Sequence, residues 1–324
     1  MSAGRIDGPC VACGRRGLTF RFAIGGERMY RCDSCRTHHV RPLPDAMRLH
    51  EYYDEEYALV GQVGADDAAA ATARARTYPG TTQVAGLIAR HVPAAHRVAE
   101  VGCSSGYLLW GLRERGYDVE GFELSATTSE LARRMLGLTV HTTAAPPAER
   151  AGAYDVIVMR HVLEHVLDPA ATIADLGRAL APGGALILAT PNVDSFAARV
   201  CAEDWEWMSP PAHLHLFTPR GLRALLERGG LTVLGEETRR GDARPFAVAL
   251  LRRAASRLAV RRALTSRFGT LQPDGGGGAV AGRLAGLRGG VMALAEACDR
   301  LGSPLGSWVA RRGAAEELWM VARR

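Results

Sequence analysis

The stretch Arg97–Gly106, which reads RVAEVGCSSG, joins a short apolar segment to a turn punctuated by glycine. Gly102 and Gly106 give the backbone access to conformations closed to other residues and leave room for a ligand to approach the main chain. Helix-forming residues resume at Tyr107, so the turn is expected to open a helix whose free amides face that ligand. Ser104 stands where a dinucleotide-binding turn has its middle glycine, which makes the stretch a poor match to the NAD fingerprint.

A second acidic position follows the turn. Residues 118–122 (DVEGF) predict a strand, and Glu123 lies at its end. This position is about 20 residues after the turn, where a carboxylate can accept hydrogen bonds from both hydroxyls of a ribose. Only one such unit is evident, so the expected ligand contains one adenosine.

Four blocks, taken in order, resemble the class I S-adenosylmethionine-dependent methyltransferases: EVGCSSG (100–106), Glu123, DVIVMRHVLEHVLDP (155–169) and LAPGGALILATPN (180–192). The resemblance covers about residues 80–240 and the last strand. It implies an α/β, Rossmann-like, doubly wound sheet of seven strands whose last strand is antiparallel. It also implies a site for S-adenosyl-L-methionine that is formed by Glu100, Gly102, Cys103, Ser104, Gly106, Tyr107, Glu123, Leu124, Arg160 and His161. The alternative is a doubly wound domain that binds another nucleotide or none.

Strand and helix patterns alternate through this region, as in a parallel sheet. Helices are expected at about 81–91, 107–115, 126–136 after a Ser125 cap, 169–180 and 219–228. Strands are expected at 97–101, 118–122, 138–142, 154–159, 185–189, 231–236 and 317–322, with a chain reversal at 182–184. In the family, an acidic residue near the end of the third strand often contacts adenine. Here the residues are His141, Thr142, Thr143, Ala144 and Ala145, so backbone or another side chain must hold the base.

The segment RHVLEH (160–165) directly follows the fourth strand, where ligands of parallel sheets collect. On the resemblance, Arg160 and His161 border the methionine part of the cofactor. His165 is a candidate general base, because imidazole titrates near neutral pH, and a loop-tying hydrogen bond is an equal alternative. The spacing also fits an inverted zinc-peptidase motif, but Asp168-Pro169 interrupts the long helix that such chemistry needs.

The segment DWEWMSPPAHLHLFT (204–218) is rich in aromatic residues, proline and histidine, which favours a substrate wall. His213 and His215 share one face if the backbone is extended there. We interpret them as catalytic bases or orienting groups. A divalent metal is the alternative, but no carboxylate lies at close spacing.

Four cysteines form two knuckles, Cys10-x2-Cys13 and Cys32-x2-Cys35, separated by 18 residues. This spacing predicts a tetrahedral structural zinc site. Between them, residues 18–24 and 27–31 predict a hairpin that turns at Gly25-Gly26. A disulfide pair is the alternative, disfavoured inside a cell. His38 and His39 could each replace a ligand but are not needed.

The predicted organisation has five parts: a zinc-ribbon-like module (1–44), a linker and helical lid (45–80), the methyltransferase domain (81–240), a helical insertion (241–313) and the last strand (314–324). Tyr52, Tyr53 and Tyr57 in the linker have helical spacing, which favours packing over function. The insertion contains a basic amphipathic pattern over about residues 250–264. Four roles are open for this insertion: docking on a membrane surface, self-association, coverage of the active site, or a solvated helix packed on its own domain.

All 40 basic residues of the 324-residue chain are arginine, the formal net charge is +6, and the arginines are scattered. No nucleic-acid partner is therefore expected. Neither a long apolar span nor a signal-peptide pattern is evident, which predicts a cytoplasmic enzyme. The expected reaction is methyl transfer to a hydroxyl of a sugar or secondary metabolite, because the ribbon and linker also resemble bacterial methyltransferases of that kind. Transfer to nitrogen or carbon, and a non-catalytic adenosine-binding or partner-binding protein, are the alternatives.

Overall fold

The computed structural model describes residues 4–45, 68–239 and 314–324. The chain divides into two compact units. The first comprises Met1–Val193, Ser209–Glu237 and Glu317–Arg324, and the second comprises Asp194–Met208 and Thr238–Glu316. The predicted tyrosine stripe (Tyr52, Tyr53 and Tyr57) and the predicted basic helix of the insertion lie outside the described residues.

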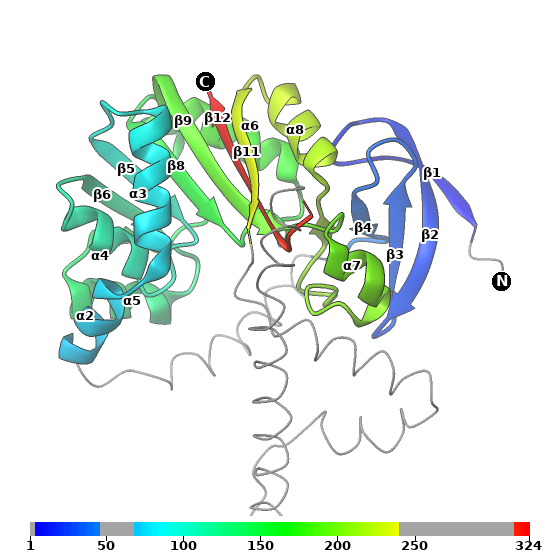
Figure 1. The fold of residues 1–324 in the computed structure, drawn as a ribbon, viewed down its shortest axis with the longest axis horizontal. Coiled ribbons are helices and arrows are strands. Elements are labelled where there is room, and N and C mark those ends of the chain that lie inside the picture. The colour runs from blue at the N-terminus through cyan, green and yellow to red at the C-terminus, as the bar shows by residue number, and fades with distance from the viewer. Residues whose placement is uncertain (1–3, 46–67, 240–313) are drawn as a thin grey trace, which may run out of the picture. The chain divides into compact units, whose positions relative to one another are not determined.

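A seven-stranded sheet forms the centre of the first unit, in the order β11-β12-β9-β8-β5-β6-β7 (Figure 1). β5 pairs in parallel with β6 and β8, β8 with β9, and β6 with β7, whereas β12 pairs antiparallel with β9. The predicted doubly wound fold with an antiparallel last strand is therefore confirmed. The strands are β5 (Arg97–Val101), β6 (Asp118–Phe122), β7 (Val140–His141), β8 (Tyr154–Arg160), β9 (Leu180–Pro191), β11 (Thr232–Arg239) and β12 (Glu317–Arg323).

The central strands are apolar because both of their faces are covered. Val156 and Val158 of β8 belong to one buried cluster, which α3 and α4 complete, and Ile157 and Met159 belong to a second, which α6 and α8 complete. The side chains alternate because successive residues of a strand point to opposite faces. The helices of this unit are α2 (Ala68–Arg76), α3 (Pro79–His91), α4 (Tyr107–Arg113), α5 (Ala126–Leu136), α6 (Pro169–Ala179) and α8 (Pro219–Arg228), with the 3-10 turn η1 (Ala148–Arg150).

Side-chain caps begin three of these helices. The Ser125 side chain accepts from the amide of Thr128 at the start of α5, and Thr218 accepts from the amide of Gly221 at the start of α8. Asp168 accepts from the amides of Ala170 and Ala171 at the start of α6. Each cap satisfies helix amides that would otherwise lack a partner, which is why the predicted helix starts were accurate.

Two sequence predictions need correction. The turn predicted at residues 182–184 falls within a strand, because β9 runs from Leu180 to Pro191, and Gly183 has a left-handed φ of 78° there. The register between β8 and β9 shifts there, between Tyr154 and Val156. The third predicted strand shortens to β7, Val140–His141, at the edge of the sheet, where only one neighbour fixes its length.

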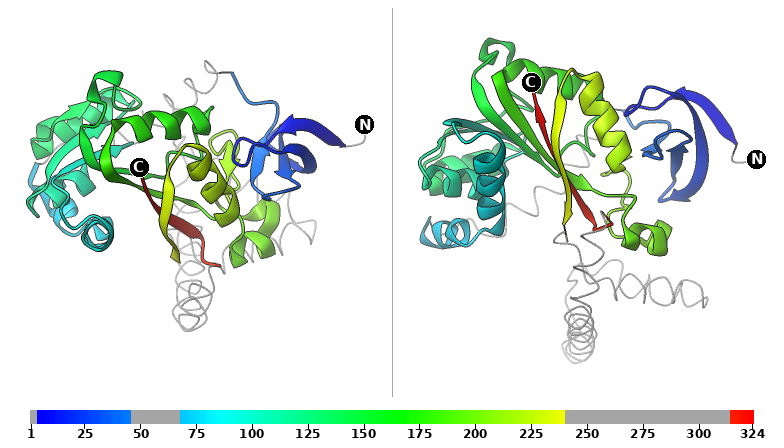
Figure 2. Two further views of the ribbon diagram at one scale, coloured as in Figure 1. Left: turned by 90° about the horizontal axis from the view of Figure 1, so that it is seen from above. Right: turned by 45° about the horizontal axis from the view of Figure 1, so that its top comes forward.

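The N-terminal residues form a second sheet in the same unit, which we call the ribbon. Its strands are β1 (Arg5–Pro9), β2 (Arg16–Ile24), β3 (Glu27–Cys32) and β4 (His38–Val40), joined by β10 (His215–Leu216). The predicted hairpin between β2 and β3 is present. In both views of Figure 2 the ribbon lies beside α8, and Arg228 of α8 donates hydrogen bonds to the carbonyls of Val11 and Ala12.

The second unit contains α7 (Phe196–Cys201) and the 3-10 turn η2 (Ala202–Asp204). Ser195 caps α7 by accepting from the amide of Ala198. The indole of Trp205 donates to the carboxylate of Glu316 at 3.1 Å. Of the helices in the described ranges, none has the length and apolar character needed to cross a membrane.

Candidate functional site

The glycine turn at the carboxyl end of β5 has the left-handed backbone that the sequence indicated. The φ angles are 73° at Gly102, 48° at Ser104 and 76° at Gly106. A Cβ atom at Gly102 would lie 2.2 Å from Val162, and one at Gly106 would lie 2.5 Å from Leu138. Glycine at 102 therefore lets the loop after β8 contact the turn closely.

Glu123 at the end of β6 holds the turn in place. Its Oε2 accepts from the Ser104 amide at 2.8 Å, and its Oε1 accepts from the Ser125 amide at 2.9 Å. The carboxylate is 3% exposed. Each carboxylate oxygen keeps a further acceptor position, which suits the two hydroxyls of a ribose.

Glu100, at the end of β5, is a buried carboxyl group. It is 5% exposed, and its Oε2 has no hydrogen-bond partner among the described residues. Burial raises the pKa of Glu100 to about 8, and the nearby Glu123 charge adds to this shift while Arg160 opposes it. An unpartnered buried acceptor of this kind is suited to a ligand cation.

Three other predicted cofactor residues surround the turn. Cys103 is buried, and its sulfur packs against Gly121. A Cβ atom added at Gly121 would lie 2.7 Å from that sulfur. Tyr107 begins α4, with its ring centroid 6.3 Å from that of Tyr78. Leu124 is 69% exposed, and an exposed apolar side chain beside the ribose-binding position could cover one face of a base.

Arg160, at the end of β8, is enclosed by aromatic rings. Its guanidinium carbon lies 5.6 Å from the ring centroid of Tyr78 and 5.2 Å from that of Trp319. It also donates a 2.7 Å hydrogen bond to the Tyr78 hydroxyl. These contacts fix a cation at the carboxyl edge of the sheet by cation–π attraction and a hydrogen bond.

His161 is held between two carboxylates. Its Nε2 lies 2.6 Å from Glu317 and its Nδ1 lies 3.4 Å from Glu164. Burial disfavours the charged imidazole, but the hydrogen bonds to Glu164 and Glu317 outweigh it and raise the pKa of His161 to about 9. The residue adopts φ 51°, a strained conformation for a residue other than glycine. Its charge therefore anchors the loop instead of serving as a base.

Glu164, His165 and His213 form a cluster whose potential ligand atoms lie within 4.8 Å of one another. The His165 Nδ1 lies 3.0 Å from the Ala212 carbonyl, which can only accept, so the lone pair of the neutral ring is on Nε2. Burial lowers the pKa of His165 and outweighs the opposing effect of the Glu164 charge, so the ring is neutral at pH 7. Burial opposes the charge of Glu164, but the His161 hydrogen bond prevails and lowers its pKa to about 2.

This cluster supplies the carboxylate that a metal site at the histidines would need. The sequence prediction disfavoured a metal because no carboxylate lay at close spacing, yet the fold places Glu164 beside both His165 and His213. The three residues could hold a divalent cation or relay a proton. His165 can serve both as a general base and as a tie for the loop, since its Nδ1 bonds the Ala212 carbonyl while its Nε2 carries the lone pair.

His215 lies in different surroundings. The chain is extended only at His215–Leu216 and turns before it, so the condition for His213 and His215 to share a face is not met. The His215 ring is fully buried, with its Nδ1 3.3 Å from the Nδ1 of His39 in the ribbon. The Nδ1 of His213 instead lies 3.2 Å from the Ser209 hydroxyl. The ring centroids of His213 and His165 are 4.8 Å apart.

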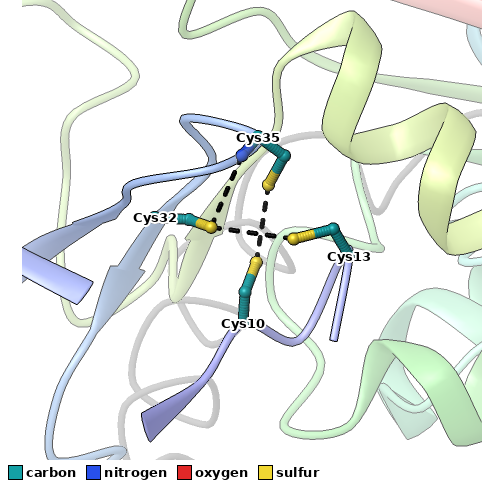
Figure 3. A group of neighbouring side chains, drawn as sticks. All are labelled: Cys10, Cys13, Cys32 and Cys35. Atoms are coloured by element: carbon teal, nitrogen blue, oxygen red, sulfur yellow. Dashed lines mark hydrogen bonds between the residues drawn. The ribbon is translucent and has the colours of Figure 1, made fainter. Parts of the chain in front are cut away.

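The four predicted metal-ligand cysteines converge on one point (Figure 3). The Sγ atoms of Cys10 and Cys35 are 3.5 Å apart, and those of Cys13 and Cys32 are 3.7 Å apart. Zinc–sulfur bonds of about 2.3 Å in a tetrahedron require sulfur separations of about 3.8 Å. These separations exceed the disulfide length of about 2.05 Å and suit a four-thiolate zinc site.

Several site residues were not predicted from the sequence. Tyr78 and Trp319 enclose Arg160, and Glu317 pairs with His161. Tyr78 precedes the first expected helix, and Glu317 and Trp319 belong to the last strand. The only available signal was Glu317 at the start of an otherwise apolar strand, where a charge needs a partner.

The chain is similar in sequence to known proteins. A family model described as "Methyltransferase domain" matches residues 69–236. A ubiquinone biosynthesis O-methyltransferase of Cereibacter sphaeroides is 31% identical over 147 residues, which cover 42% of this chain and 60% of that protein. A protein of the same name from Xanthomonas axonopodis is 31% identical over 156 residues, covering 44% and 65%. The chain thus spans less than two thirds of these relatives.

Among solved structures, the chain matches 1,6-didemethyltoxoflavin-N1-methyltransferase of Burkholderia thailandensis. It has a TM-score of 0.47 and 12% identity and covers 94% of this chain and 98% of its own. A putative sarcosine dimethylglycine methyltransferase of Galdieria sulphuraria has a TM-score of 0.45 and 14% identity, covering 75% and 84%.

Proposed function

Because the chain belongs to the family described as a methyltransferase domain, we propose that it transfers a methyl group from S-adenosylmethionine to a hydroxyl group of a small molecule. One observation carries the donor assignment: two buried carboxyl groups, Glu100 and Glu123, flank a left-handed turn at the ends of adjacent strands. Glu123 would accept from the ribose hydroxyls, and Leu124 would cover the adenine. Glu100 would meet the ammonium of the methionine part.

S-adenosylmethionine supplies a methyl group activated by a sulfonium, so the protein must align the acceptor and remove one proton. His165 is the proposed base, because its ring is neutral and its Nε2 carries the lone pair. The ionised Glu164 would stabilise the imidazolium that forms. His161 keeps Glu164 in place, and His213 would orient the acceptor.

The choice of a hydroxyl acceptor is supported by the names of the relatives, which are O-methyltransferases. A sugar or secondary metabolite remains the proposed substrate class. Enclosed cations and histidines at the carboxyl edge of the sheet suit a polar acceptor more than an apolar one.

We also propose that the four cysteines bind one zinc ion with a structural role. Four thiolates leave no open coordination position for catalysis. A ribbon of short strands has little apolar core of its own, so metal binding would supply folding free energy.

Calorimetric titration with S-adenosylmethionine and S-adenosylhomocysteine tests the donor site. Glu123→Ala should weaken binding by about 100-fold, because it removes the charged acceptor of the hydrogen bonds that two hydroxyls donate. Glu130→Ala is the matched control, since Glu130 is exposed on α5 and pairs only with Arg133 among the described residues. Absence of binding to both ligands in the wild type would refute the donor assignment.

A radiolabelled methyl donor then tests the acceptor. The wild type is incubated with separate panels of phenols, sugars and amines, and the product is identified by mass spectrometry. We expect an ether from a hydroxyl compound, and His165→Ala should lose at least about 100-fold in rate while retaining S-adenosylhomocysteine binding. Methylated amine without any ether would overturn the hydroxyl assignment.

A further inference from the structure

One strand of the ribbon comes from far along the chain. β10 pairs antiparallel with β4, with His215 opposite His39 and Leu216 opposite His38. The Val40 amide also donates to the Leu214 carbonyl at 2.9 Å. The ribbon sheet is therefore incomplete without residues 214–216, which follow β9 in the methyltransferase domain.

The same short segment contacts the histidine loop on its other side. The amides of Leu214 and His215 donate to the Glu164 carbonyl at 2.9 and 3.1 Å. The His165 ring donates to the Ala212 carbonyl at 3.0 Å. Residues 212–216 thus connect the ribbon to the backbone of the proposed base, and they carry His213.

Side chains extend this connection to a cysteine. The Cys10 Sγ lies 3.1 Å from the His39 Nε2, and the His39 Nδ1 lies 3.3 Å from the His215 Nδ1. Both histidines are fully buried and Cys10 is 1% exposed. A metal-bound thiolate has no proton, so the His39 Nε2–H must donate to Cys10. The Nδ1 of His39 then carries the lone pair and accepts a hydrogen bond from the Nδ1–H of His215.

We infer that the ribbon is a positioning element of the proposed acceptor site: metal binding holds residues 212–216 through the β4–β10 pairing and the Cys10–His39–His215 chain, which keeps His213 against Glu164 and His165. His39 and His215 are the positioning residues. The inference rests on the proposed function for its catalytic meaning, but its structural content is independent of the donor.

Two residues of strand cannot keep this geometry by themselves. A strand of this length depends on its neighbours, and β10 has β4 on one side and the loop after β8 on the other. Loss of the metal removes the support for β4, because Cys32 ends β3 and Cys35 lies in the short connection from β3 to β4. The predicted consequence is a displaced His213 in a protein whose central sheet remains folded.

The test uses full-length protein with 15N-labelled histidine, compared with zinc bound and after removal of zinc by a chelator. We expect His39 to be protonated on Nε2 and His215 on Nδ1 in the zinc form. Zinc removal should change the His165 and His213 signals and speed exchange of the Leu214 and His215 amides at least tenfold. The Val156 and Ile187 amides in the central sheet should keep their protection.

A pair of variants keeps the test decisive if the zinc-free protein unfolds. His39→Gln retains a donor and an acceptor, whereas His39→Leu removes both, and neither removes a cysteine. In zinc-loaded protein, the leucine variant should shift the His165 and His213 signals, and the glutamine variant should largely restore them. Unchanged signals in the leucine variant, or a protein that binds no zinc, would overturn the inference.

Titration with S-adenosylhomocysteine on the same samples separates this result from the donor assignment. Retained binding with shifted histidine signals supports both proposals. No binding in any sample, with the same histidine changes, refutes the donor site and leaves the connection between ribbon and histidines intact.

Discussion

Burial raises the pKa of Glu100 to about 8, so this side chain is protonated at neutral pH. A ligand ammonium would favour the carboxylate, and binding of S-adenosylmethionine at pH 7 should therefore release close to one proton, about 0.9. Calorimetry in buffers with different ionisation enthalpies measures this number. Glu100→Gln should abolish the release and weaken binding, and a wild type that binds without proton release would contradict the role given to Glu100.

His161 predicts a loss of stability in alkali. Its pKa is raised to about 9 from an ordinary value of 6.5, so the stability it contributes is fully present below pH 6.5 and disappears as the pH rises through 9. The unfolding temperature of the wild type should fall between pH 8 and 10. His161→Gln should be less stable at pH 7 and show a shallower decline. Parallel curves for the two proteins would exclude this ion pair as the cause.

Alanine substitutions at two glycines, one directly before a helix and one within a helix, should change the free energy of unfolding in opposite directions. Gly106, directly before α4, has φ 76°, and a Cβ atom there would overlap Leu138, so Gly106→Ala should destabilise by about 2 kcal/mol. Gly86 is exposed within α3, and a Cβ atom at this position would meet nothing within 4 Å, so Gly86→Ala should stabilise by about 0.5–1 kcal/mol. Urea unfolding measures both changes, and a stable Gly106→Ala would show that the turn is not constrained.

The strand β10 belongs to the ribbon sheet but comes from the chain segment after β9, which predicts that the ribbon and the central sheet unfold together. Differential scanning calorimetry of zinc-loaded protein should show one transition for both. Cys13→Ser should remove the zinc and lower its midpoint by at least about 5 °C. Cys201→Ser, at a buried cysteine of α7, is the control that retains the metal. A separate early transition for the ribbon would show that the two sheets are not coupled.

The sequence was sufficient for the features that depend on neighbouring residues. The helix cap at Ser125, the glycine turn and the cysteine knuckles are local patterns, and the structure places them as expected. Alternating strands and helices predicted a parallel sheet, and the antiparallel last strand was implied by the resemblance to the methyltransferases.

Contacts between distant segments could not be predicted. Glu164 lies beside His213, and β10 pairs with β4, only because the sheet brings together chain segments that share no pattern. Histidine spacing suggested that His213 and His215 act together, but turns before β10 separate their surroundings. The turn expected at residues 182–184 lies inside β9, in the gap between Leu180 and Ala185, the two residues at which the pairing with β8 is interrupted and resumes.

The distance in sequence between β4 and β10 has a consequence for how the chain folds during synthesis. His39 and His215 are 176 residues apart, so the ribbon leaves the ribosome long before its fifth strand exists. All four cysteines lie within the first 35 residues, and metal capture can therefore precede completion of the sheet. The early ribbon then presents β4 as an open edge, and closing such a long loop costs little more entropy than closing one of half the length. In nascent chains without zinc, the edge of β4 would not be formed when β10 is synthesised. β10 would then be available to pair with other strands.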